Sequence, residues 1–198
     1  MLMALQPHLS LEPMQTARFF GATLALSAFL LSPSAARAEP RGPQLVQERD
    51  RFMDQRNGGV AVLAGWSAVS LVGGTLFLID PPWLPEVAPT STERRAFGIA
   101  TLSFAAVNAA FVVSGLVNTT SLERSLVTLP DVVNERRSGA TFFAVNAGLD
   151  MLYIAGGAML AQSETPVLRG LGAGVLTQGG FLIGFDVTSA MTYRFGGW

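Results

Sequence analysis

Two carboxylates lie deep inside long apolar stretches in the C-terminal half of the chain. Asp150 follows Asn146 by one helical turn in the first of these stretches, and Asp186 follows Gln178 by about two turns in the second. An ionisable group at membrane depth costs several kcal/mol, and it usually faces a protein interior or a water-filled cavity. These four residues are therefore the first place to look for function.

Three kinds of chemistry are open to carboxylates in this setting. They can fix helix packing through hydrogen bonds in a structural or accessory protein, which is the function that we predict. The alternative is a small proton- or cation-coupled transporter or channel subunit that uses Asp150 and Asp186. A third, weaker candidate is an intramembrane enzyme with the two carboxylates as an acid/base pair, since close carboxylates split their pKa values.

The residues that the chain lacks exclude most familiar enzyme mechanisms. There is no cysteine, all 13 basic residues are arginine, and the only histidine, His8, lies in a segment that we expect to be removed. Such a mature chain has no imidazole base, thiol nucleophile, Schiff-base amine or histidine ligand for haem or zinc. We therefore predict no enzyme activity, no cofactor and no metal site. The net charge of −1 without a basic run also argues against nucleic acid as a partner.

Four apolar segments predict an all-α fold, a four-helix transmembrane bundle. They cover residues 58–79, 96–117, 139–161 and 170–192, and residues 193–198 form a C-terminal tail. Each has about 22 residues, which is enough to cross the hydrocarbon core as a helix, and only helices satisfy every backbone group within one segment. The lipid bilayer is thus a predicted partner, and a membrane protein or a second copy of the chain is a further candidate.

Residues 1–38 are predicted to be a cleavable signal peptide. Arg18 precedes an apolar run over residues 19–31, and the small-x-small pattern of Ala36-Arg37-Ala38 ends just before Glu39. The apolar run is too short to span a bilayer comfortably, although an uncleaved signal anchor is the alternative. We therefore expect Glu39 to be the mature N-terminus.

The segment that follows and the distribution of arginines bear on orientation. Residues 39–57 are polar with apolar residues at roughly helical spacing, and we predict a lead-in that is either an amphipathic helix on the membrane surface or a solvated segment. An exported N-terminus followed by four spans places both termini outside. This arrangement leaves only Arg94, Arg95 and Arg169 in cytoplasmic connections, against the positive-inside rule. Because a translocating signal acts first, we still predict both termini outside a bacterial inner membrane.

The tight connection between the last two spans sets which of their residues share a depth. Antiparallel neighbours place residues level when they lie equally far from the turn. On this basis Asn146 is level with Asp186, and Asp150 is level with Gln178, so each acid has an amide donor. We predict two hydrogen-bonded rungs, whose main role is to fix register because such bonds average about 0.6 kcal/mol in membranes.

Two further patterns concern the spans. In the first hairpin, the same argument places Asn108 level with Ser67 at middle depth. Small residues let helix backbones approach closely, and we predict packing within the bundle, with a dimer face as the alternative. The residues concerned are the GxxxG pair Gly180 and Gly184, with Gly65, Gly73, Gly148 and Gly156. A faint internal repeat aligns Gly65 and Gly73 with Gly148 and Gly156.

The last two spans also carry short motifs. These are Asn146-Ala147-Gly148-Leu149-Asp150 followed by Tyr153, and Gln178-Gly179-Gly180-Phe181-Leu182 with Phe185-Asp186. Over about residues 45–193 the chain resembles an uncharacterised family of small bacterial four-helix membrane proteins that often carry an N-terminal signal. The family pattern has a tryptophan where Trp66 stands and an Asn- and Trp-rich second span, of which this chain keeps only part, including Asn108. The resemblance implies a fold and no activity.

Overall fold

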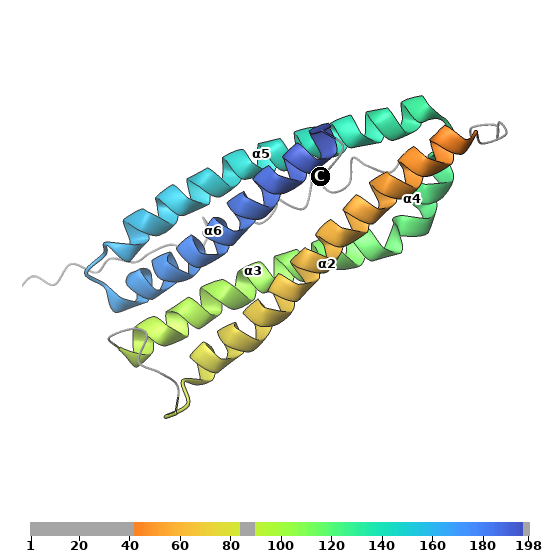
Figure 1. Ribbon diagram of the computed structural model, residues 1–198. Coiled ribbons are helices and arrows are strands. Elements are labelled where there is room, and N and C mark those ends of the chain that lie inside the picture. The colour runs from red at the N-terminus through yellow and green to blue at the C-terminus, as the bar shows by residue number, and fades with distance from the viewer. Residues whose placement is uncertain (1–41, 84–89, 196–198) are drawn as a thin grey trace, which may run out of the picture. The chain divides into compact units, whose positions relative to one another are not determined.

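Five α-helices make up the described part of the chain. The structure, a computed structural model, describes residues 42–83 and 90–195, so the predicted signal peptide and its cleavage site lie outside the described residues. The helices are α2 (Pro43–Ile79), α3 (Ser91–Val117), α4 (Thr119–Ser125), α5 (Leu129–Ala161) and α6 (Pro166–Phe195) (Figure 1). All except α4 are long and apolar enough to cross a membrane, which confirms the predicted all-α four-helix bundle.

The four long helices form two antiparallel hairpins. Helix α2 packs along α3, and α5 packs along α6 (Figure 1). The hairpins meet mainly where α3 lies against α6, with smaller contacts from α2 to α5 and α6. Side chains that join the two hairpins therefore lie on α6 and on the α2 and α3 surfaces that face it.

Helices α2, α3 and α5 end where the hydropathy pattern predicts, whereas α6 continues to Phe195 into the predicted tail, and all four long helices begin earlier than predicted. Residues 43–57, which were predicted as a separate lead-in, continue directly into the first span as one helix, α2. Pro43 suits this start because its ring fixes a helical φ and its missing N–H is not needed in the first turn. The connection at residues 118–137 is also largely helical, since it contains α4 and the start of α5. Helices α2 and α5 therefore begin in polar sequence, outside the apolar segments.

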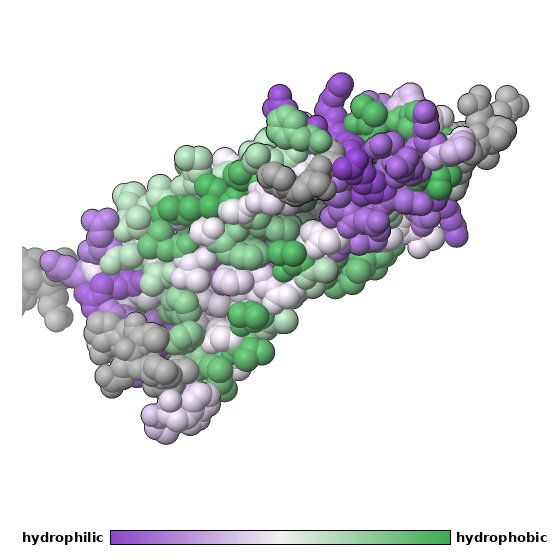
Figure 2. Space-filling view, in the orientation of Figure 1, coloured by the Kyte–Doolittle hydropathy of each residue, from purple (hydrophilic) through white to green (hydrophobic). Residues whose placement is uncertain are grey.

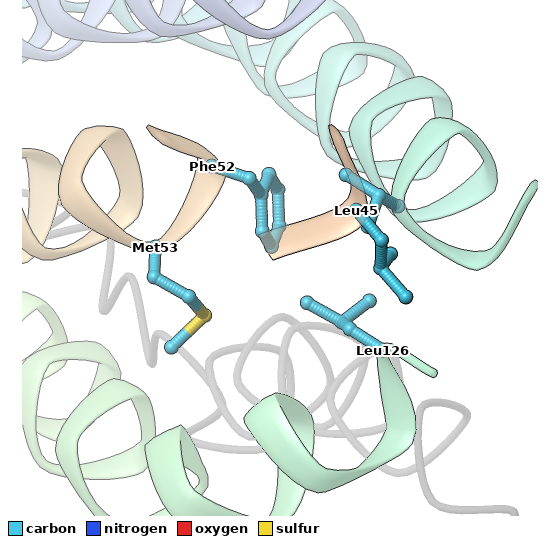
Figure 3. Close-up of a cluster of buried hydrophobic side chains, with 5 residues drawn as sticks. Leu45, Phe52, Met53 and Leu126 are labelled. Atoms are coloured by element: carbon cyan, nitrogen blue, oxygen red, sulfur yellow. The ribbon is translucent and has the colours of Figure 1, made fainter. Parts of the chain in front are cut away.

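A small apolar core holds these polar extensions together. Leu45, Phe52 and Met53 of α2 are buried against Leu126, with Val132 of α5 in the same cluster (Figure 3). Around this core, Arg136 pairs with Glu48 and Arg49 pairs with Glu123. On the face shown in Figure 2, hydrophilic residues gather at this end and, in a smaller group, at the α5–α6 turn, with apolar residues between them.

Capping interactions explain two of the early helix starts. Thr90 and Glu93 form a capping box at the start of α3, and Thr128 and Asp131 form another at the start of α5. In each box the threonine hydroxyl accepts from the N3 backbone N–H, while the N3 carboxylate accepts from the N-cap backbone N–H. Both helices can therefore begin in polar sequence ahead of their apolar segments.

Asp80 ends α2 and is held by an arginine from the next helix. It is a left-handed residue with φ of 52°, a conformation that aspartate tolerates better than bulkier residues do. Arg94 donates to both of its carboxylate oxygens, and this hydrogen-bonded ion pair holds the pKa of the Asp80 carboxyl below its usual range. Because the pKa is lowered, this contribution to stability is present at neutral pH and is lost as the pH falls through the folded-state pKa.

Glycines bring the backbones of each hairpin into contact, but they are not the predicted ones. A Cβ on Gly98 would lie 2.6 Å from the Gly74 carbonyl oxygen, and one on Gly172 would lie 2.6 Å from the Gly157 carbonyl oxygen. The two hairpins thus use the same kind of contact near their turns. The six glycines predicted to pack within the bundle have nothing within 4 Å of a built Cβ, so that prediction was wrong; they are Gly65, Gly73, Gly148, Gly156, Gly180 and Gly184.

Candidate functional site

Four of the five predicted site residues are buried in the middle of the bundle. Asn108 of α3, Asp150 of α5, and Gln178 and Asp186 of α6 are all less than a tenth exposed, whereas Asn146 is half-buried. In a helix that crosses a bilayer, polar groups turned inward avoid the cost of facing lipid. The orientation of these residues therefore fits a polar layer inside a membrane-embedded bundle.

The α5–α6 hairpin has the depth register that its tight turn predicts. A Cβ on Gly179 would touch Ile154, and one on Gly139, nearer the other end, would touch Tyr193. Within each pair, the two residues lie about equally far from the turn. Depth, however, leaves the rotation of each helix about its axis undetermined.

The two acids pair with each other and not with the amides. The side chains of Asp150 and Asp186 lie in hydrogen-bonding contact across the α5–α6 seam. The predicted rungs from Asn146 to Asp186 and from Asp150 to Gln178 were therefore wrong. The physical reason is rotation: Gln178 faces α2, so its amide is unavailable to the seam, and both carboxylates turn inward instead.

Gln178 forms a hydrogen-bonded bridge from α6 to α2. Trp66 Nε1 donates to Gln178 Oε1 at 2.8 Å, and Gln178 Nε2 donates to Ser70 Oγ at 3.1 Å. The Trp66 ring also stacks on Phe181, with ring centroids 4.1 Å apart and an interplanar angle of 10°. These contacts satisfy the indole N–H and both ends of a fully buried amide, which ties the first hairpin to the second.

Replacing Gln178 with leucine is expected to destabilise the bundle by about 2 kcal/mol, because a buried donor or acceptor without a partner costs about 1–3 kcal/mol. The change removes the acceptor of Trp66 and a partner of Ser70 while conserving apolar volume. The free energy of unfolding, measured by denaturant titration in detergent, checks this expectation. Trp66→Phe is the matched variant, since it removes the indole N–H and should cost less. Equal stability of Gln178→Leu and wild type would contradict the bridge.

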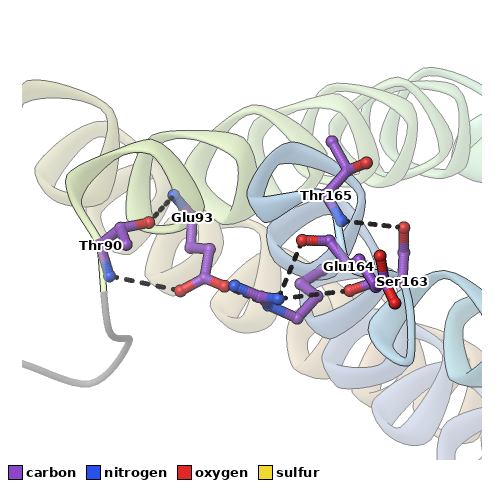
Figure 4. A network of polar contacts seen from close by, with 6 residues as sticks. Thr90, Glu93, Ser163, Glu164 and Thr165 are labelled. Carbon is purple, nitrogen blue, oxygen red and sulfur yellow. Dashed lines mark hydrogen bonds and ion pairs between the residues drawn. The ribbon is translucent and has the colours of Figure 1, made fainter.

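A second link joins the hairpins at the end that carries both hairpin turns. Glu93 of α3 is buried and accepts from Arg169 Nε, in addition to its role in the capping box (Figure 4). Arg169 also donates to the Glu164 carbonyl oxygen at 3.1 Å and to that of Ser163 at 3.4 Å. A Cβ on Gly170 would lie 2.8 Å from Ala96 Cβ, so only glycine admits this close approach of α6 to α3.

Some buried polar atoms have no hydrogen-bond partner in the described part of the chain. In the apolar zone they are Asp150 Oδ2, Asn108 Nδ2 and Thr101 Oγ1. The contacts of Gly115 with Val60 and of Gly74 with Leu102 lie on either side of Asn108 and place it level with Ser67, as predicted. Among residues 42–83 and 90–195, no group of three or more His, Cys, Asp or Glu side chains is placed to hold a metal ion.

A protein-family model matches residues 62–187, which is more than half of the chain. The chain belongs to the family of unknown function DUF6992. No curated protein and no solved structure matches it. The DUF6992 match confirms the resemblance to an uncharacterised family, and it includes Trp66, Glu93, Asp150, Gln178 and Asp186. It leaves out the polar start of α2, including Leu45 and Phe52.

Sequence reasoning missed the partners that link the hairpins of this DUF6992 chain. Trp66 was noted only for the family pattern, although a buried tryptophan usually finds an acceptor for its indole N–H. Glu93 was missed because the second span was taken to start at Ala96, yet the pattern Thr-x-x-Glu at Thr90 signals a capping box. Arg56, which donates to the Gly115 carbonyl oxygen and to Thr119, carries no comparable sequence signal.

Proposed function

We propose that this DUF6992 protein is a non-enzymatic, multi-pass protein of the bacterial inner membrane that serves as a structural or accessory component of a larger membrane assembly. The observation that carries the proposal is the Gln178 bridge, in which both ends of a buried amide bond to α2. Glu93 is similarly occupied by its cap and by Arg169. These polar side chains bind helix to helix, so they support a packing role.

The outward glycines support a partner in the membrane. Gly180 and Gly184 of α6 are exposed, and a Cβ on either meets nothing within 4 Å. Gly65 on α2 and Gly148 on α5 are likewise exposed. Small-xxx-small faces let a second helix approach closely, so another membrane protein or a second copy of the chain fits this surface better than lipid tails alone.

A proton- or cation-coupled transporter or channel subunit is the second candidate function. It is favoured by the contact between Asp150 and Asp186, because ionisable groups inside a membrane commonly mark ion or proton pathways. This function requires a water-accessible path to the carboxyl pair. It predicts that deletion of the protein alters ion or solute flux and that the isolated protein conducts in vesicles.

Purification of the tagged protein from native membranes in mild detergent tests the accessory function. We expect a stoichiometric membrane partner, or a defined homo-oligomer, that persists through size-exclusion chromatography. Gly184→Leu should release this partner while the chain stays folded, and Ala158→Leu, at a half-buried site on α5, is a matched control for added bulk. If the protein purifies as an isolated monomer, and if its deletion from the cell changes ion or solute flux, transport would be favoured and the accessory function contradicted.

A further inference from the structure

The apolar zone of the bundle contains no basic residue. Across residues 58–79, 96–117, 139–161 and 170–192, the only ionisable side chains are Asp150, Asp186 and the phenol of Tyr153. Two ionised carboxylates would therefore carry a charge of −2 at membrane depth without a counter-charge in any of the four spans. Such a state is strongly disfavoured, since each buried charge needs a partner.

The two carboxyl groups are placed where they can share a hydrogen. Asp150 is 4% exposed and Asp186 is 6% exposed. They lie on α5 and α6, which pack against each other along the second hairpin. Their carboxyl groups lie against each other across the α5–α6 seam. Both groups are acceptors when ionised, so a favourable contact between them needs a hydrogen or another positive charge between the two carboxyl groups. Independently, Asp150 Oδ2 has no donor among the described residues.

The polar side chains that the neighbouring helices carry at about this depth are neutral. Helix α2 contributes Ser67, whose hydroxyl donates to the Leu63 carbonyl oxygen, and α3 contributes the Asn108 amide at a similar depth. The Tyr153 ring of α5 packs edge-on against Phe104. Arginines lie only toward the ends of the helices, where Arg56 binds the end of α3 and Arg169 binds Glu93.

We propose that Asp150 and Asp186 form a proton-binding site in which one proton from water is held between the two carboxyl groups. The O–H of one carboxyl donates to the carboxylate of the other, and the charge of the pair falls from −2 to −1. Two carboxylates that share a site titrate as a unit of this kind, because the first charge opposes the second. The proposal is independent of any assembly partner and of any transport activity.

Infrared spectroscopy of the purified full chain in lipid nanodiscs tests the site directly. At neutral pH we expect a carbonyl stretch of a carboxylic acid that shifts in deuterium oxide, with the intensity of one group per chain. Labelling the wild-type protein with carbon-13 at the aspartate carboxyl should shift the same band. The double variant Asp150→Asn, Asp186→Asn should lose it entirely, whereas Asn146→Ala should retain it. The labelling experiment needs no substitution, so the test stands even if the double variant fails to fold.

Three outcomes would overturn the proposal. The first is wild-type protein without a carboxylic acid band at neutral pH, which would show both groups ionised. The second is a band that is absent in sodium or potassium buffer and appears when choline replaces the metal ion, which would show a monovalent cation between the carboxylates in place of the proton. A band unaffected by carbon-13 aspartate would likewise exclude this pair as its source.

Discussion

Gly172→Ala should lower the free energy of unfolding by about 3 kcal/mol, since forcing atoms into a well-packed contact costs about 1–3 kcal/mol and occasionally more. The added methyl would collide with the Ala161 backbone nitrogen and lie 2.6 Å from the Gly157 carbonyl oxygen. Neither neighbour is the end of a flexible side chain that can move aside, so the helices α5 and α6 must separate. Denaturant titration in detergent, followed by circular dichroism, measures the loss.

Gly184→Ala is the matched control on the same helix. A Cβ there meets nothing within 4 Å, and alanine favours a helix over glycine by about 1 kcal/mol, so its stability should equal or exceed that of wild type. The opposite order, with Gly172→Ala tolerated and Gly184→Ala destabilising, would show that α6 is turned away from the described orientation.

Glu93→Ala is expected to cost about 2–4 kcal/mol, because it removes a capping interaction worth about 1 kcal/mol and breaks an ion pair whose carboxylate is buried. Glu93 is only 2% exposed and accepts from both the Thr90 backbone N–H and Arg169 Nε. Arg169 is partly exposed, so water can solvate its guanidinium once Glu93 is removed. The loss of stability should therefore be smaller than for a fully buried ion pair. Unfolding in detergent provides the measurement.

Glu93→Gln separates the two roles of this residue. Glutamine keeps the capping geometry but removes the charge that Arg169 binds, so it should recover about 1 kcal/mol of the loss. If Glu93→Ala and Glu93→Gln were both as stable as wild type, the link between α3 and α6 would contribute nothing to the bundle.

The fold was accessible from sequence because four long apolar segments leave few structural options. A segment of 20 or more apolar residues has few options other than a spanning helix, so the ends of α2, α3 and α5 fall where hydropathy changes. Helix starts were less predictable, since capping boxes and the apolar cluster around Phe52 extend the helices into polar sequence. The capping boxes are local and have a sequence signature, whereas the cluster around Phe52 depends on segments far apart in the chain.

For the candidate site, the sequence predicts the depth of the polar residues but not the direction in which their side chains point. A short turn fixes the depth of each residue in the α5–α6 hairpin, and the described contacts have that register. Rotation about each helix axis depends on contacts with the other hairpin. The hydrogen bonds with Trp66 and Ser70 turn Gln178 toward α2. The same problem affected the glycines, because a GxxxG pattern marks a face without indicating whether that face points inward.

The most direct test of the central claim, that the intramembrane polar groups serve packing and assembly, is to purify Asp150→Asn, Asp186→Asn from native membranes and compare its partner stoichiometry and stability with those of wild type. Two amides can replace the carboxyl contact with a hydrogen bond and carry no titratable proton. We expect an unchanged assembly and an unchanged unfolding midpoint. An intact assembly whose ion or solute flux is lost in this variant would contradict it and establish transport as the function.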